Sequence, residues 1–146
     1  MRAAEGATGS NDERLSLLLT GPRLAGPAIH VPETPGAYVL WLNLRTPVCL
    51  KVGISENLRR RIRFHVRQDE RNTVLARHLI AAPPPGAWKY DFNNRSERQL
   101  FLQRECSFQA IQLSDLTREA LGEFESFLEE HLQPKYRGKV GKREEG

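Results

Sequence analysis

The sequence contains few cysteines and no long apolar segment. Its 146 residues include two cysteines, Cys49 and Cys106, which are too few for a disulfide framework. Neither belongs to a Cys-x-x-Cys pair or has a histidine at ligand spacing, which argues against a zinc site. Both lie in or beside apolar runs, so we expect reduced thiols in the core. No stretch approaches the roughly 20 apolar residues that cross a bilayer.

Several other signatures are missing. Residues 1–14 lack the apolar core of a secretory signal, and we therefore expect a cytoplasmic protein. No phosphate-cradling glycine loop, His-Glu-x-x-His zinc motif or Gly-x-Ser-x-Gly nucleophile motif occurs. No zinc finger or helix-turn-helix is evident, so any sequence specificity would need a protein partner.

Clustered positive charge is what the sequence does contain. The net charge is +4, and arginines concentrate in one segment: Arg59, Arg60, Arg61, Arg63, Arg67 and Arg71. Acidic residues enter this segment only at its end, so the arginines repel one another without compensation. The cluster therefore favours contacts with nucleic-acid phosphate. A solvated charged helix face is the alternative interpretation.

The patterning predicts one domain over residues 15–137, between a disordered leader, 1–14, and a flexible tail, 138–146. Dense β-forming runs at 37–42 and 48–54 predict a hairpin. Helices are expected at 15–19, 58–70, 73–82 and 118–132, and further strands at 88–92 and 105–113. The predicted class is α+β.

Three side chains stand out within these elements. Glu125 borders the apolar stripe of the helix 118–132, where a carboxylate is costly unless a metal ion or an arginine compensates it. A boundary glutamate that reaches water is the simpler interpretation. Arg61 and His65 lie one turn apart, beside the predicted buried face of the arginine-rich helix.

The order of these features resembles the GIY-YIG nuclease superfamily. The matching blocks are Gly36–Tyr38, Lys51–Gly53, Asn57–Ile62, and Glu125 followed by Pro134–Tyr136. The resemblance extends over residues 35–137. It implies a small three-stranded antiparallel sheet flanked by helices, and the metal-dependent cleavage of nucleic-acid phosphodiesters, with DNA as the expected substrate.

The resemblance also implies residue roles. Tyr38 is the first-motif tyrosine, Arg61 faces the scissile phosphate, and Glu125 binds the metal, Mg²⁺ or Mn²⁺. His65 corresponds to a position directed into the site, and Lys51 replaces the second-motif tyrosine. The general base is thus left open among Tyr38, Lys51 and His65. Arg59, Arg60, Arg63 and Arg67 are expected to bind the nucleic acid.

Two other functions are compatible with the same sequence. A nucleic-acid-binding module that has lost cleavage would account for Lys51 in the second motif. A purely structural interaction protein would have no affinity for nucleic acid at low salt.

Overall fold

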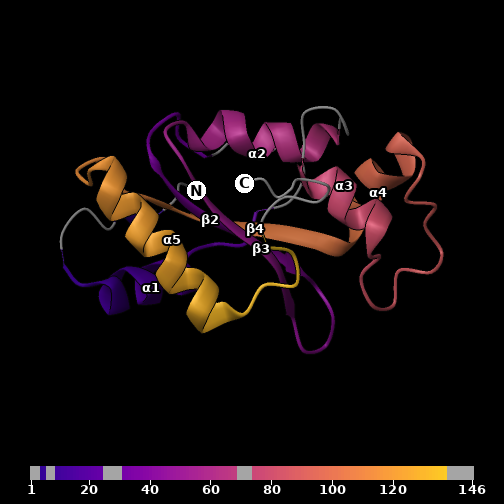
Figure 1. The fold of residues 1–146 in the computed structure, drawn as a ribbon, viewed down its shortest axis with the longest axis horizontal. Coiled ribbons are helices and arrows are strands. Elements are labelled where there is room, and N and C mark those ends of the chain that lie inside the picture. The colour runs from indigo at the N-terminus through magenta and orange to yellow at the C-terminus, as the bar shows by residue number, and fades with distance from the viewer. Residues whose placement is uncertain (1–3, 6–8, 25–30, 69–73, 138–146) are drawn as a thin grey trace.

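A four-stranded sheet forms the centre of the computed structural model, which describes residues 4–5, 9–24, 31–68 and 74–137 (Figure 1). Its strands are β1 (Ala4–Glu5), β2 (Gly36–Leu42), β3 (Val48–Ser55) and β4 (Cys106–Gln112). They lie in the order β1-β4-β2-β3, with β2 antiparallel to both β3 and β4. The predicted α+β class and three-stranded antiparallel sheet are therefore confirmed, and the short β1 extends the sheet in parallel with β4.

Helices cover both faces of this sheet. The helices are α1 (Asn11–Thr20), α2 (Leu58–Arg67), α3 (Val74–Ala81), α4 (Arg95–Glu105) and α5 (Arg118–Leu132). Figure 1 shows α1 and α2 on opposite sides of the strands. None of the described helices is long and apolar enough to span a lipid bilayer.

The central strand β2 contributes to two separate cores. Successive side chains of a strand point to opposite faces, and Tyr38 and Leu40 pack in the cluster that includes Leu58 of α2. Ala37 and Val39 pack in the cluster that includes Phe124 of α5. Because both faces of β2 are buried, its sequence is continuously apolar and does not alternate between apolar and polar residues.

Gly36 allows α2 to lie directly on the start of β2. A Cβ atom at this position would stand 2.6 Å from Cδ1 of Leu58 and would also collide with the backbone oxygen of Ile111. Asn57 begins the helix there, since its side chain accepts a hydrogen bond of 3.0 Å from the backbone N–H of Arg60.

The end of α2 is held by side chains from α4. Arg98 is fully buried and donates from Nη2 to the carbonyl oxygen of Gln68 and from Nη1 to that of Phe92, both at 2.8 Å. Arg95 Nε also donates to the carbonyl oxygen of Arg67, at 2.9 Å. The bonds to Arg67 and Gln68 satisfy carbonyls at the end of α2, and Nε2 of Gln99 also donates to the Arg67 oxygen, at 3.0 Å.

Some boundaries differ from those expected. No strand forms at 88–92, because successive turns are closed by the Tyr90 N–H to the Ala87 oxygen and the Asn94 N–H to the Asp91 oxygen. The helix α4 was not predicted. Helix α2 ends at Arg67, where Gln68 takes a left-handed φ of 57°, instead of continuing to residue 70.

The first residues also differ from the prediction of a disordered leader. Residues 4–5 form β1, and α1 begins at Asn11 with Ser10 as its N-cap in a capping box with Glu13. Residues 1–3, 6–8 and the predicted flexible tail, 138–146, lie outside the described residues.

Replacing Arg98 with Met should destabilise the fold by about 3 kcal/mol, because two buried carbonyls lose charge-assisted donors while the packing volume is largely kept. Urea unfolding would measure this loss. The matched control is Arg95→Met, which removes an exposed arginine from the same helix and should cost about 0.5 kcal/mol or less. Equal losses in the two variants would contradict the clamping role of Arg98.

Candidate active site

Tyr38 is buried at the middle of the sheet between two small residues. Its neighbours across the strands are Gly53 in β3 and Ala110 in β4. A Cβ atom on Gly53 would lie 2.6 Å from Cζ of Tyr38, so only glycine leaves room for the ring. Tyr38 as a whole is only 1% exposed. Burial raises the pKa of its hydroxyl to about 12, although the nearby charge of Arg61 opposes the rise.

His65 joins α2 to this tyrosine. Its Nε2 lies 2.6 Å from the Tyr38 hydroxyl oxygen, and its ring packs against Phe108 with centroids 6.5 Å apart. Burial, and then the charges of Arg61 and Lys51, hold the pKa of His65 well below its usual value. A neutral imidazole can accept a proton from the hydroxyl at Nε2.

Lys51 and Arg61 place two positive charges beside this pair. Lys51 lies in β3 opposite Leu40 and is only 9% exposed. Burial lowers the pKa of Lys51, the charge of Arg61 lowers it further, and the carboxylates of Glu125 and Glu129 oppose the change. Arg61 is half-buried, and its charge lowers the pKa of Tyr38, Lys51 and His65, so it lies near all three.

Glu125 on α5 brings a carboxylate to the same group. Burial raises its pKa, the neighbouring Glu129 raises it further, and Lys51 and Arg61 act in the opposite direction. Among the described residues it has no ion pair or hydrogen bond. A half-buried carboxylate that lacks a direct partner retains the capacity to bind a cation.

Glu129 was not singled out from the sequence. It follows Glu125 by one helical turn and acts on both Glu125 and Lys51. The spacing of four residues, which places two side chains on one helix face, was the available signal. Glu123 and Glu130, on the same helix, are exposed.

The donor set around Glu125 fits one kind of metal ion better than others. Within the described ranges, no cluster of three or more His, Cys, Asp or Glu side chains forms a closed metal cage. Magnesium is usually held by one or two carboxylates together with water and substrate phosphates. Glu125, with Glu129 beside it, therefore suits a hard divalent ion whose remaining ligands are water and the phosphate of the substrate.

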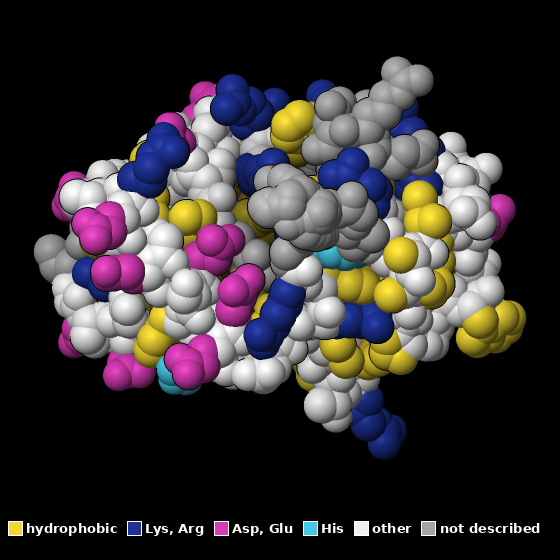
Figure 2. Space-filling view, in the orientation of Figure 1, with side chains coloured by type: hydrophobic (Ala, Val, Ile, Leu, Met, Phe, Trp, Pro, Cys, Tyr) yellow, Lys and Arg dark blue, Asp and Glu magenta, His cyan; other side chains and the backbone are white. Residues whose placement is uncertain are grey.

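A groove lined by arginines opens next to this group. Its volume is about 660 Å³, and α2 supplies most of its lining: Arg59, Arg60, Arg61, Arg63, Phe64 and Arg67. In Figure 2, Lys and Arg side chains gather over α2, whereas Asp and Glu side chains gather over α5. Arg61 belongs both to the groove and to the buried group, so it connects the two.

The groove arginines differ in how much they are already engaged. Arg59 donates from Nε to the carbonyl oxygen of Val31 at 2.8 Å and lies 4.0 Å from a Glu33 oxygen. Arg60, Arg63 and Arg67 are exposed, and none forms an ion pair with a described carboxylate. Uncompensated like charges around one groove produce a potential that attracts a polyanion.

The sequence-predicted site residues thus separate into two sets. Tyr38, Lys51, Arg61, His65 and Glu125 come together in one electrostatically coupled group. The predicted nucleic-acid-binding residues line the adjacent groove: Arg59, Arg60, Arg63 and Arg67. Cys49 and Cys106 are free, buried thiols, as expected.

No protein-family model and no curated protein matches this chain. Three solved structures are similar to it, all point mutants of the GIY-YIG N-terminal endonuclease domain of UvrC from Thermotoga maritima, bound to the catalytic divalent cation. The first has 17% sequence identity and a TM-score of 0.36, covering 74% of this chain and 87% of that domain.

The other two structures each cover 90% of this chain and 100% of the domain. Their sequence identities are 17% and 15%, and their TM-scores are 0.38 and 0.36, respectively.

Acid should destabilise the protein through its buried histidines. The pKa of His78 is lowered to about 4, mainly by burial, and that of His65 is also lowered. Below about pH 6.5 the unfolded chain protonates both while the folded chain resists. The free energy of unfolding therefore decreases as the pH is lowered, by at most about 1.4 kcal/mol per pH unit for each histidine. The raised pKa of Glu125 has the opposite effect, because the folded protein binds that proton more readily than the unfolded chain does.

His65→Phe should make this dependence shallower between pH 6.5 and 5, as measured by urea unfolding at a series of pH values. His131→Phe, at an exposed position of α5, is the control and should keep the wild-type slope. An unchanged slope in His65→Phe would mean that folding does not lower the pKa of His65.

Proposed function

We propose that this protein is a metal-dependent endonuclease that hydrolyses phosphodiester bonds of nucleic acid, with DNA as its substrate. The observation that carries the proposal is the electrostatic grouping of Tyr38, Arg61 and Glu125 beside a groove lined by arginines. The order of their motifs resembles the GIY-YIG nuclease superfamily, which gives the reaction class. The two buried free thiols agree with a reducing compartment, the cytoplasm.

Glu125 would hold the divalent ion, Mg²⁺ or Mn²⁺, with Glu129 as its neighbour on the helix. When bound, the ion supplies Lewis-acid neutralisation of charge on the phosphate and the leaving oxygen. The charge of Lys51 interacts with both carboxylates. When the ion is absent, this positive charge would offset the repulsion between Glu125 and Glu129.

Arg61 binds the scissile phosphate. Its planar guanidinium presents several donors in a fixed fork that matches phosphate oxygens, and charge developing during cleavage strengthens these bonds. Because Arg61 also lines the groove, a strand held there by the exposed arginines would bring one phosphate to the buried group.

The Tyr38–His65 pair removes the proton from the attacking water. As Tyr38 takes this proton, its own hydroxyl proton passes along the 2.6 Å hydrogen bond to Nε2 of His65. The charge of Arg61 is one cause of the lowered pKa of His65. A phosphate bound to Arg61 offsets that charge and therefore makes His65 a stronger base when substrate is present.

A binding module without cleavage remains the second candidate, and the observation that favours it is Lys51 in place of the second-motif tyrosine. Both candidates predict binding to nucleic acid with a steep salt dependence, whereas a structural interaction protein does not. Only the nuclease converts supercoiled plasmid or branched DNA to cleaved products when magnesium is added.

Glu125→Gln should lower magnesium-dependent cleavage by about 100-fold or more, since the amide keeps the shape but cannot supply a carboxylate charge. Plasmid nicking and cleavage of branched DNA and RNA, with and without magnesium, would measure it. The control is Glu123→Gln, an exposed position on the same helix, which should retain activity. Undiminished cleavage by Glu125→Gln would refute the metal assignment.

His65→Phe should reduce the cleavage rate by about 100- to 10,000-fold while leaving KM nearly unchanged, because the ring is kept and the proton acceptor is lost. Lys51→Met should cause a smaller fall. Steady-state kinetics on one oligonucleotide would compare them, after circular dichroism has verified folding. A larger loss in Lys51→Met would identify Lys51 as the base instead.

A further inference from the structure

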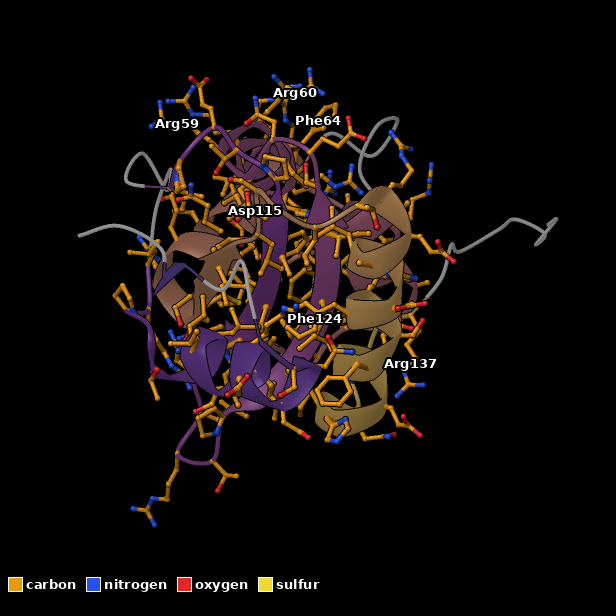
Figure 3. The ribbon with its side chains drawn as sticks, turned by 90° about the vertical axis from the view of Figure 1, so that its left-hand side faces the viewer. Arg59, Arg60, Phe64, Asp115, Phe124 and Arg137 are labelled. Carbon is orange, nitrogen blue, oxygen red and sulfur yellow. The ribbon has the colours of Figure 1, made fainter. Side chains whose placement is uncertain are left out.

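Phe64 is an aromatic residue in an otherwise charged groove. It lies on α2 between Arg60 and Arg67 and lines the groove together with both. Figure 3 shows it beside Arg60 and Arg59 at one end of the molecule. Its side chain is half-buried.

The ring of Phe64 already has a planar cation over it. The Arg67 guanidinium carbon lies 5.0 Å from the ring centroid. At an exposed position such a cation–π contact contributes only about a two- to five-fold preference. Stacking of a nucleic-acid base on an aromatic side chain contributes more, about 5- to 150-fold per base.

An aromatic ring flanked by arginines can contact a base as well as phosphates. From these observations we infer that Phe64 is a stacking platform for one unpaired base of the nucleic acid. The base takes the place of the Arg67 guanidinium over the ring, and Arg67 turns to a neighbouring phosphate. Arg60 and Arg63, which are exposed and form no ion pair with a described carboxylate, hold the backbone on either side.

The consequence is a substrate class. A base inside a duplex has both faces covered by its neighbours, so it cannot stack on a protein ring without leaving the helix. A platform next to the scissile-phosphate arginine therefore selects strands with unpaired nucleotides near the cleaved bond. This inference rests on the proposed function for its substrate, although the platform itself is tested by binding alone.

Binding in the presence of EDTA would test the platform on the full chain, by fluorescence anisotropy. The probes are a labelled oligothymidylate and an abasic strand of the same length, which carries the same phosphates without bases. Wild-type protein should bind oligothymidylate about 5- to 150-fold more tightly than the abasic strand. Phe64→Leu, which keeps apolar volume but removes the ring, should abolish this difference.

Two control variants separate stacking from packing and from chance aromatic contacts. Phe64→Tyr keeps the ring and should keep the preference. Trp88→Ala removes an aromatic residue that is 89% exposed and lies outside the groove, and it should also keep the preference. Thermal melting of Phe64→Leu establishes that the variant is folded.

The outcomes distinguish this inference from the proposed function. Equal binding of the two strands by wild-type protein, or an unchanged preference in Phe64→Leu, would overturn the platform and leave the nuclease proposal intact. Base-dependent binding without magnesium-dependent cleavage would support the platform and contradict the nuclease. Absence of binding to either strand would overturn both.

Discussion

The hydrogen bond between Tyr38 and His65 is the interaction on which the rest of the site depends. It joins the central strand to the arginine-rich helix at a point where both side chains are 1% exposed. Small neighbours on either side, Gly53 and Ala110, make room for the tyrosine ring, and Gly36 lets the first turn of α2 contact the sheet. Burial raises the pKa of Tyr38 and lowers that of His65, so it favours the neutral form of both groups, and under the proposed function the pair would pass a proton between these two side chains.

Charge is divided between two helices around this bond. Helix α2 carries the arginines of the groove, and α5 carries Glu125 and Glu129 (Figure 2). Arg61 belongs to the groove and acts on the buried group, while Lys51 approaches the same group from β3. Under the proposed function, this arrangement would bind the polyanion on one helix and the cation on the other, as phosphodiester hydrolysis assisted by a metal ion requires. Arg98 supports it from a distance by fixing the end of α2.

The hairpin and helices α2 and α5 could be predicted from the sequence, because their signals are local. The residues of the coupled group were instead suggested by the order of motifs along the chain, and their roles remain predictions. Helix α4 escaped prediction because its buried face is formed by Arg98, Phe101 and Leu102. The spacing is helical, but an arginine counts as exposed in any apolar pattern, and only the carbonyls it reaches in the fold explain its burial. The strand expected at 88–92 does not form; the rings of Tyr90 and Phe92 both pack against Phe101 from a series of turns. Phe64 was recognised only in the tertiary structure, because its importance comes from the groove that it lines. Glu129 was missed although its four-residue spacing from Glu125 was visible in the sequence.

The central claim is that this site hydrolyses a phosphodiester whose phosphate contacts a divalent ion held at Glu125. The most direct measurement uses a DNA substrate with one non-bridging oxygen of the scissile phosphate replaced by sulfur. Magnesium binds sulfur poorly and manganese binds it better. The account predicts that one sulfur stereoisomer is cleaved much more slowly than the oxygen substrate in Mg²⁺ and recovers in Mn²⁺. Equal cleavage of the oxygen and both sulfur substrates in Mg²⁺, or no cleavage of the oxygen substrate in either metal, would contradict it.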